Sequence, residues 1–181
     1  MKRVVFLTVA ALFAASMVFA QQGSIGIFRD TAGTNCTLLD AAPGLTPYYV
    51  VQVNTTGSSA CAFAAPKPAC LAAQYLSDTG VWPVSLGNSQ TLASVGYGAC
   101  KIGNVHVLTL NYFTMGATAP CCRYFITAGT ALSGQIETVD CVGNLYFVTG
   151  GQGIVNSNGT CLCNVPVEDT TWGGVKALYG E

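Results

Sequence analysis

The stretch that most constrains the fold is Val105–Phe113, with the sequence VHVLTLNYF. Nine residues rich in β-branched and aromatic types, without glycine or proline, predict one long β-strand. In an extended chain, His106, Leu108, Leu110 and Tyr112 share one face of this strand. Both faces are largely apolar, which predicts a central strand that is covered on both sides.

The strands expected along the rest of the chain are short and recur about every ten residues. They are Ser24–Phe28, Pro47–Val53, Ala60–Ala65, Leu71–Leu76, Val81–Leu86, Thr91–Val95, Cys122–Thr127, Gln135–Val139, Leu145–Thr149 and Gly153–Val155. Turn-forming residues separate them, for example at Asn54–Ser59, and no long helical period intervenes. This pattern predicts an all-β fold, an antiparallel β-sandwich of the Ig-like or Greek-key type, rather than a βαβ fold.

The first twenty residues are laid out like a secretory signal peptide. Lys2 and Arg3 precede an apolar run, and Val18-Phe19-Ala20 places permissive residues where a signal peptidase reads. The alternative is a retained membrane anchor, but the apolar stretch lies at the lower edge of the roughly 17 to 25 residues that a spanning helix needs. We therefore expect a secreted protein, extracellular, periplasmic or at the cell surface, that begins near Gln21 and has no membrane span after cleavage.

About 161 residues remain, which fits one domain. We expect the β-sandwich to occupy residues 21–166 and a C-terminal docking segment to follow at 167–181. Charged residues make up only 8% of the chain, with seven basic against eight acidic residues, where soluble domains usually carry about a quarter. No basic patch is present, so nucleic acid is not an expected partner. A surface with little charge repulsion associates easily, which favours a role in assembly.

Nine cysteines in a secreted chain of this size predict a disulfide framework with at least one cysteine left over. They are Cys36, Cys61, Cys70, Cys100, Cys121, Cys122, Cys141, Cys161 and Cys163. A bridge between the neighbours Cys121 and Cys122 would be strained, so we expect them to have different partners, or one to stay free. The same holds for Cys161 and Cys163, which share a strand face. The spacing suggests one local bridge, between Cys61 and Cys70.

The cysteines do not follow the spacing of a metal or redox site. Structural zinc sites use paired C-x₂₋₄-C knuckles, and this chain has one C-x-C, one C-C and a single histidine. The C-x-x-C of thioredoxin-like proteins is also missing from the sequence. We therefore expect no metal and no cofactor.

The C-terminal segment differs in character from the strands before it. Asp169 or Thr170 can cap a short helix in which Trp172, Val175 and Tyr179 lie at i, i+3 and i+7 and form an apolar stripe. Two glycines make such a helix weak in isolation, so it should form only when docked. The stripe can dock on its own sandwich, on another copy or on a cell-surface partner.

Catalytic motifs are weak. A Ser-His-Asp or Cys-His site would have to use His106, the single histidine, and no G-x-S-x-G elbow is present. Cys122-Arg123 matches two residues of the peptidoglycan L,D-transpeptidase motif but lacks the rest of it, which leaves a Cys/His-dependent cell-wall enzyme as a remote alternative. The carboxylates that glycoside hydrolysis would need, Asp78, Glu137 and Asp140, are scattered. We expect no enzyme activity.

Six short motifs spread along the mature chain carry a family resemblance. They are Gly33-Thr34-Asn35-Cys36, Gly87-Asn88-Ser89-Gln90-Thr91, Tyr97-Gly98-Ala99-Cys100, Ser133-Gly134-Gln135-Ile136-Glu137, Val139-Asp140-Cys141 and Val165-Pro166-Val167-Glu168-Asp169-Thr170-Thr171-Trp172-Gly173. Together they resemble a family of secreted, cysteine-containing, β-rich hypothetical proteins from environmental bacteria. The resemblance implies secretion and a β-rich fold. That family has no established activity, so it implies no site residue.

Two non-catalytic functions fit these observations. The first is a structural or interaction protein of the cell surface or extracellular matrix, including one that self-assembles, whose partner is itself or a cell-surface component. The alternative is an extracellular binding module, for example for carbohydrate, with Tyr48, Tyr49, Trp82 or Tyr97 as a stacking platform.

Overall fold

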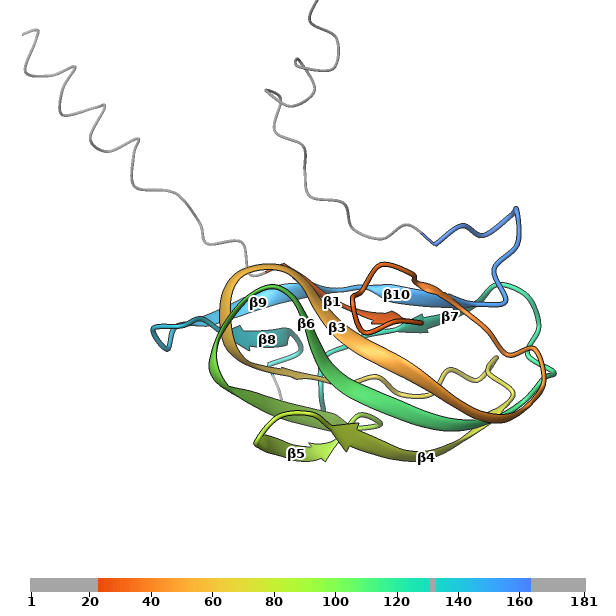
Figure 1. Ribbon diagram of the computed structural model, residues 1–181, viewed down its shortest axis with the longest axis horizontal. Helices are drawn as coiled ribbons and strands as arrows, with labels where there is room; N and C mark the ends of the chain where they lie inside the picture. Colours follow the sequence, from red (N-terminus) through yellow and green to blue (C-terminus); the bar gives the residue numbers. More distant parts are fainter. Residues whose placement is uncertain (1–22, 131–132, 164–181) are drawn as a thin grey trace, which may run out of the picture.

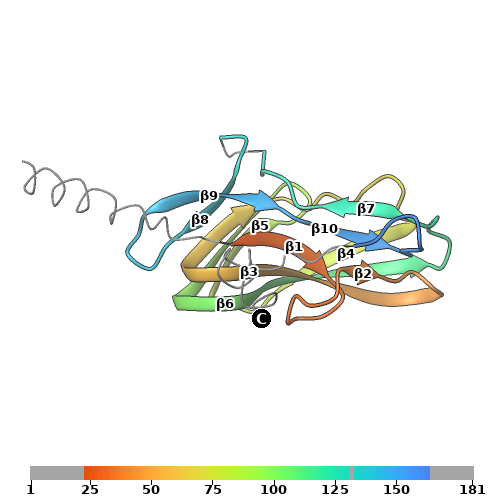
Figure 2. The ribbon, with the colours of Figure 1, turned by 90° about the horizontal axis from the view of Figure 1, so that it is seen from above.

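The computed structural model describes residues 23–130 and 133–163, and this part of the chain forms an all-β sandwich of ten strands (Figures 1 and 2). The strands are β1 (Ser24–Phe28), β2 (Thr37–Leu38), β3 (Pro43–Phe63), β4 (Ala73–Gly80), β5 (Val84–Asn88), β6 (Leu92–Met115), β7 (Cys122–Phe125), β8 (Ile136–Val139), β9 (Leu145–Gly150) and β10 (Gln152–Val155). Within these ranges no helix is long and apolar enough to cross a membrane. The expected signal peptide and the Trp172, Val175 and Tyr179 stripe with its helix lie outside the described residues.

The two longest strands, β3 and β6, pair antiparallel along nearly their whole length, from Pro43 opposite Met115 to Phe63 opposite Ala93. The sequence led us to expect a turn at Asn54–Ser59, but these residues lie within β3. Asn54 of β3 and Gly103 of β6 adopt positive φ angles of 56° and 83°. The register of the β3–β6 pairing shifts several times between Gln52 and Ala60 of β3. The turn-forming residues therefore bend a continuous ribbon through β-bulges instead of ending its strands.

The other strands attach to the edges of this ribbon. β5 and β4 pair with the two halves of β6, and β1 and β8 pair with the two halves of β3. β9 then joins β8 antiparallel and β1 parallel. A smaller sheet in the order β2-β10-β7 completes the sandwich, with β2 and β10 parallel. The expected antiparallel β-sandwich is thus confirmed, with two short parallel pairings added to it, β1 with β9 and β2 with β10.

A β-bulge in β6 changes which residues face the core. Val107 is an extra residue without an opposite partner in β3, so Val107 and Leu108 are both buried, whereas His106 and Thr109 lie on the outer face. The expectation that His106 shares a face with Leu108 is therefore wrong, because the bulge shifts the alternation by one residue. Cover on both sides was also not found, since the outer-face Phe113 is exposed.

Three tyrosines connect the two sheets through the core. Tyr48 of β3, Tyr112 of β6 and Tyr124 of β7 are fully buried, with ring centroids 5.7 to 6.5 Å apart. The hydroxyl oxygens of Tyr112 and Tyr124 lie 2.6 Å apart, and the Tyr124 hydroxyl donates to the carbonyl of Ala65 at 2.8 Å. Burial raises the pKa of all three hydroxyls. They therefore stay protonated, and each is hydrogen-bonded, since the Tyr48 hydroxyl donates to the carbonyl of Leu39 at 3.1 Å.

Four disulfides link the strand ends and loops. The pairs are Cys36–Cys163, Cys70–Cys122, Cys100–Cys141 and Cys121–Cys161. The neighbours Cys121 and Cys122 have different partners, as do Cys161 and Cys163, which confirms those expectations. The predicted bridge between Cys61 and Cys70 is wrong. Cys61 is a free, buried thiol on the inward face of β3, while Cys70 pairs with β7.

Asp40 is the centre of a buried hydrogen-bond network that joins three distant segments. Its carboxylate accepts the N–H groups of Gly116, at 2.6 Å, and of Thr118, at 3.0 Å, as well as the Thr118 hydroxyl. The Asn156 side chain accepts the Asp40 N–H and donates to the Thr118 carbonyl. Burial alone would raise the pKa of the Asp40 carboxyl, but the hydrogen bonds outweigh it and hold this pKa below its usual value.

Replacing Asp40 should therefore lower stability in a pH-dependent way. A carboxyl with a depressed pKa in the folded state contributes stability above its unfolded pKa, near about 3.9, and loses that contribution as the pH falls through the folded value. We expect Asp40→Asn to reduce the free energy of unfolding by about 2 kcal/mol at pH 7. We also expect it to make stability less sensitive to pH below about pH 4.

Urea denaturation at neutral and acidic pH measures both effects. Gln135→Ala is the control, because Gln135 is exposed and lies outside the sheet groove described below. Equal stability of Asp40→Asn and the wild type at pH 7 would contradict the role given to this network.

Candidate binding surfaces

Five strands of the large sheet, β5, β6, β3, β8 and β9, carry two rows of outward-facing residues that the strand register aligns. The first row is Val84, Gly96, Ala60, Val139 and Leu145. The second row is Leu86, Ser94, Ala62, Glu137 and Phe147. Residues paired across neighbouring strands lie on the same face, so these ten residues form one continuous surface, called the sheet groove below.

The sheet groove has a floor of small residues and apolar walls. The floor consists of Gly96, Ser94, Ala60 and Ala62. Val84 and Leu86 on β5 form one wall, and Leu145 and Phe147 on β9 form the other. Leu86 is 65% exposed and Phe147 is 56% exposed. Leu86 and Leu145 line a cavity of about 260 Å³, and Phe147 lies two residues along β9 from Leu145. Large exposed apolar side chains around a cavity are typical of an interaction site.

The dimensions of the sheet groove suit one element of secondary structure. β5 and β9 are four strand spacings apart, which is about 19 Å across the sheet. An α-helix with its side chains is about 10 to 12 Å wide, so one helix fits between the walls. Glu137 is the single charged residue among the ten row positions.

The catalytic candidates are not brought together. The imidazole of His106 packs edge-on against the ring of Tyr49 and hydrogen-bonds the Thr109 hydroxyl at 3.1 Å. Burial lowers the pKa of His106, and Cys122 is held in a disulfide. A Cys/His site of the kind considered from the sequence therefore cannot form from these two residues.

The three carboxylates occupy separate places in the structure. Asp78 accepts the N–H and hydroxyl of Ser89 at 2.6 and 2.8 Å. Asp140 accepts the N–H groups of Val142 and Asn144 and holds the turn between β8 and β9. Glu137 lies in the sheet groove. Asp78 thus ties β4 to the turn between β5 and β6, and Asp140 stabilises its own turn.

The aromatic platform considered for carbohydrate does not form from the four residues named for it. Tyr48 and Tyr97 are buried. The indole N–H of Trp82 donates to the carbonyl of His106 at 2.7 Å, and Lys101 Nζ lies 4.8 Å from the centre of the indole ring. Trp82 also packs against the Tyr97 ring, at 5.3 Å between centroids. These aromatic rings are therefore used in packing.

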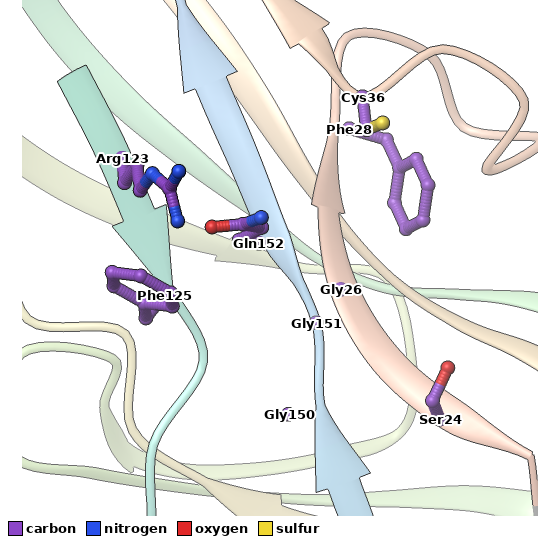
Figure 3. Close-up of a pocket in the computed structure, with 9 residues that line it drawn as sticks. All are labelled: Ser24, Gly26, Phe28, Cys36, Arg123, Phe125, Gly150, Gly151 and Gln152. Carbon is purple, nitrogen blue, oxygen red and sulfur yellow. The ribbon is translucent and has the colours of Figure 1, made fainter. Parts of the chain in front are cut away.

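A second hollow of about 340 Å³ lies between β1, β7 and β10. Figure 3 shows the Arg123 guanidinium turned toward the Gln152 amide, with the Phe125 ring beside them on the same strand as Arg123. Phe28 and Cys36 lie on the far side, and Gly26, Gly150 and Gly151 line the floor. We call this hollow the arginine pocket. It combines a cation, an amide and an aromatic ring.

Neither surface was found by sequence reasoning. The ten positions of the sheet groove are spread from Ala60 to Phe147, and only the strand register brings them into rows. The signal that could have found them is a set of apolar residues placed outward in predicted strands, such as Val84 and Leu86. In the arginine pocket, Gly150, Gly151 and Gln152 fall between the expected strands Leu145–Thr149 and Gly153–Val155, and the sequence motifs include Arg123 only beside Cys122.

No protein-family model matches this chain, and no curated protein does. Among solved structures it is similar to a cohesin module from a Clostridium perfringens family 33 glycoside hydrolase, with a TM-score of 0.47, 7% identity, 75% of this chain covered and 98% of that one. A non-cellulosomal cohesin from Archaeoglobus fulgidus has a TM-score of 0.46 at 12% identity, with 73% and 89% covered. The sixth cohesin of Acetivibrio cellulolyticus scaffoldin B, solved with a Cel5 dockerin, has a TM-score of 0.41 at 15% identity, with 75% and 98% covered. Likenesses at this level carry no information about partners or ligands.

The free thiol of Cys61 lies beneath the floor of the sheet groove and should be unreactive in the folded protein. Burial raises its pKa to about 12, despite the hydrogen bond with Tyr97. At pH 8 about one thiol in ten thousand would be ionised, and the thiolate is the reactive form. We expect no labelling by a thiol reagent in the native protein and one labelled thiol per chain in denaturant.

Mass spectrometry after labelling measures both states, and Cys61→Ala should abolish the signal in denaturant. Rapid labelling of the native wild type would show that the sheet opens above Cys61, contrary to this expectation.

Proposed function

We propose that this protein is a secreted, non-catalytic interaction protein that holds an apolar protein segment in the sheet groove. The observation that carries the proposal is the pair of aligned rows. A floor of four small residues lies between apolar walls on an outer sheet face. Side chains of this size and exposure would be unfavourable in water unless a partner covers them.

The chemistry of the sheet groove favours a protein segment over other ligands. A sugar needs several polar partners, and the ten row positions offer one carboxylate, Glu137, and one hydroxyl, Ser94. Nucleic acid needs a basic surface, which a chain with seven basic and eight acidic residues does not provide. An amphipathic helix presents an apolar stripe to such a groove and keeps its polar face in water.

The occupant that we propose is the C-terminal segment 164–181 of a second copy of this protein. Its sequence carries the apolar residues Trp172, Val175 and Tyr179 at helical spacing. Lys176 follows Val175 directly and can pair with Glu137, the single charge in the rows. The segment therefore matches the sheet groove in three respects: a helix fits between the walls, its apolar stripe suits the apolar lining, and Lys176 has a charge opposite to that of Glu137.

The position at which the described chain ends supports docking on another copy. Cys163, its last described residue, is bonded to Cys36 just before β2. Figure 2 shows β2 toward the end of the sandwich opposite the β8–β9 hairpin, which contributes one wall of the sheet groove. A tail from one copy in the groove of the next is a head-to-tail contact, which builds an open chain of subunits unless the rotation closes a ring.

Secretion and the lack of catalysis are further parts of the proposal. Four disulfides are typical of proteins that fold in an oxidising compartment. Residues 1–20 have the layout of a signal peptide. The side chains considered for catalysis, His106 and Cys122, are engaged in packing and in a disulfide.

Charged substitutions in the sheet groove should prevent assembly. We expect the chain from Gln21 onward, produced by oxidative secretion, to form oligomers or filaments. Leu86→Lys and Phe147→Lys should each raise the dissociation constant at least about tenfold, because a lysine would be desolvated in an apolar contact. Trp172→Ala should weaken assembly similarly, because the stripe loses its largest side chain. Light scattering and electron microscopy measure the outcome.

Ile102→Lys is the matched control. Ile102 is 75% exposed and lies outside the sheet groove, so this variant should assemble like the wild type. A wild-type monomer at high concentration that also fails to bind a synthetic 164–181 peptide would overturn the proposal. If Leu86→Lys and Phe147→Lys prevent assembly but Trp172→Ala does not, the sheet groove binds a different part of the second copy.

A further inference from the structure

The arginine pocket has a chemistry different from that of the sheet groove. We propose that it binds a sugar unit bearing a carboxylate, that is, a uronate of an acidic polysaccharide. The proposal does not depend on what occupies the sheet groove, because the two surfaces share no lining residue.

Arg123 supplies the charge recognition. Its side chain is exposed and makes no hydrogen bond or ion pair within the part of the chain that the structure describes. A guanidinium presents two parallel N–H groups that match the two oxygens of a carboxylate. In a chain with only seven basic residues, a free arginine at the mouth of a hollow favours an anionic ligand.

Gln152 supplies an acceptor that is still unsatisfied. Its Oε1 atom is buried and has no hydrogen-bond partner in the described structure. A buried acceptor without a donor is unfavourable, so a ligand hydroxyl that donates to Oε1 would bind at a site that is already desolvated. A carboxylate alone cannot do this, because it has no proton to donate. The ligand should therefore carry hydroxyl groups as well as a negative charge.

Phe125 supplies a flat apolar contact. Its ring is 46% exposed and lines the pocket, so one ring face of a sugar can lie against it. The floor carries no side chains, because strand packing leaves no space for them. A Cβ atom at Gly150 would lie 2.2 Å from the carbonyl oxygen of Ile126. The bare floor lets a ring approach the backbone closely.

The spacing of these groups fits one sugar ring rather than an acidic peptide. Arg123 and Phe125 are two residues apart on β7, about 7 Å, and Gln152 is the partner of Phe125 on β10. One pyranose with its carboxylate can contact all three groups at once. An acidic peptide would satisfy Arg123, but its backbone N–H and C=O groups would need partners as well, and those of Gly151 in the floor already pair with Ile25 and Ile126. The volume, about 340 Å³, lies within the range for small-ligand pockets.

Calorimetric titration of the secreted protein with short oligogalacturonates tests the proposal. We expect binding that weakens with salt, and at least about tenfold weaker binding to Arg123→Gln. The methyl-esterified oligomer has the same rings without the charges. It should bind to the wild type as weakly as the charged oligomer binds to Arg123→Gln. Gln152→Leu should weaken binding severalfold, because it removes the acceptor and keeps the size.

Arg29→Gln is the charge-matched control, because Arg29 lies outside the arginine pocket. This variant should bind oligogalacturonates with the affinity of the wild type. Thermal unfolding of each variant separates a loss of binding from a loss of fold. Three outcomes would overturn the proposal: no binding of oligogalacturonates at millimolar concentration, equal affinity of the wild type and Arg123→Gln, or equal affinity for the methyl ester. Tighter binding of an aspartate-rich peptide would reassign the pocket to acidic protein segments.

Discussion

The pairing of β3 with β6 is the interaction on which the rest of the structure depends. Twenty-one residues of β3 and twenty-four of β6 form one antiparallel ribbon, and four further strands pair with its two outer edges. Register shifts in the middle bend this ribbon. Both halves therefore contribute residues to one core cluster, which extends from Tyr48 and Val50 to Cys61 and Phe63. A straight ribbon of this length would extend far beyond the core that it has to cover.

The small sheet is attached to this ribbon by polar and covalent contacts as well as by apolar packing. The tyrosine hydroxyls connect β7 to the large sheet inside the core, and the Asp40 network joins the segments around β2, β6 and β10 at one end. Disulfides then tie the beginning of β7 to the loop between β3 and β4, and the residue before β7 to the loop after β10. The short strands β2 and β10, which pair over two residues, are thereby fixed although their own ladder is brief. The sheet groove lies outside these constraints, whereas the arginine pocket is built on β7 and β10, the strands that they fix.

Local sequence pattern predicted the fold class and most strand positions, because alternation and turn residues act over short distances. Ser24–Phe28 matches β1, and Val105–Phe113 lies within β6. The pattern failed where the same residue type is compatible with two backbone structures, a turn or a β-bulge within a strand. Asn54 and Gly103 are typical of turns but form bulges, and Val107 shifts the alternation so that His106 points outward. Pairing partners and register depend on the whole chain. Neither the sheet groove, made from positions as far apart as Ala60 and Phe147, nor the free Cys61 could therefore be derived from spacing.

The alternation of side chains along β3 and β6 separates the residues that shape the sheet groove from the residues that pack the core. In the floor of the sheet groove, Ala60 and Ala62 face outward while their neighbours Cys61 and Phe63 face the core. A change of floor residue alters the depth of the groove without entering the core, and a change of wall residue alters its width. Related chains can therefore diverge in what they recognise through single substitutions on one face while the packing that keeps them folded is inherited intact. In this architecture, new specificity can evolve at little expense to stability.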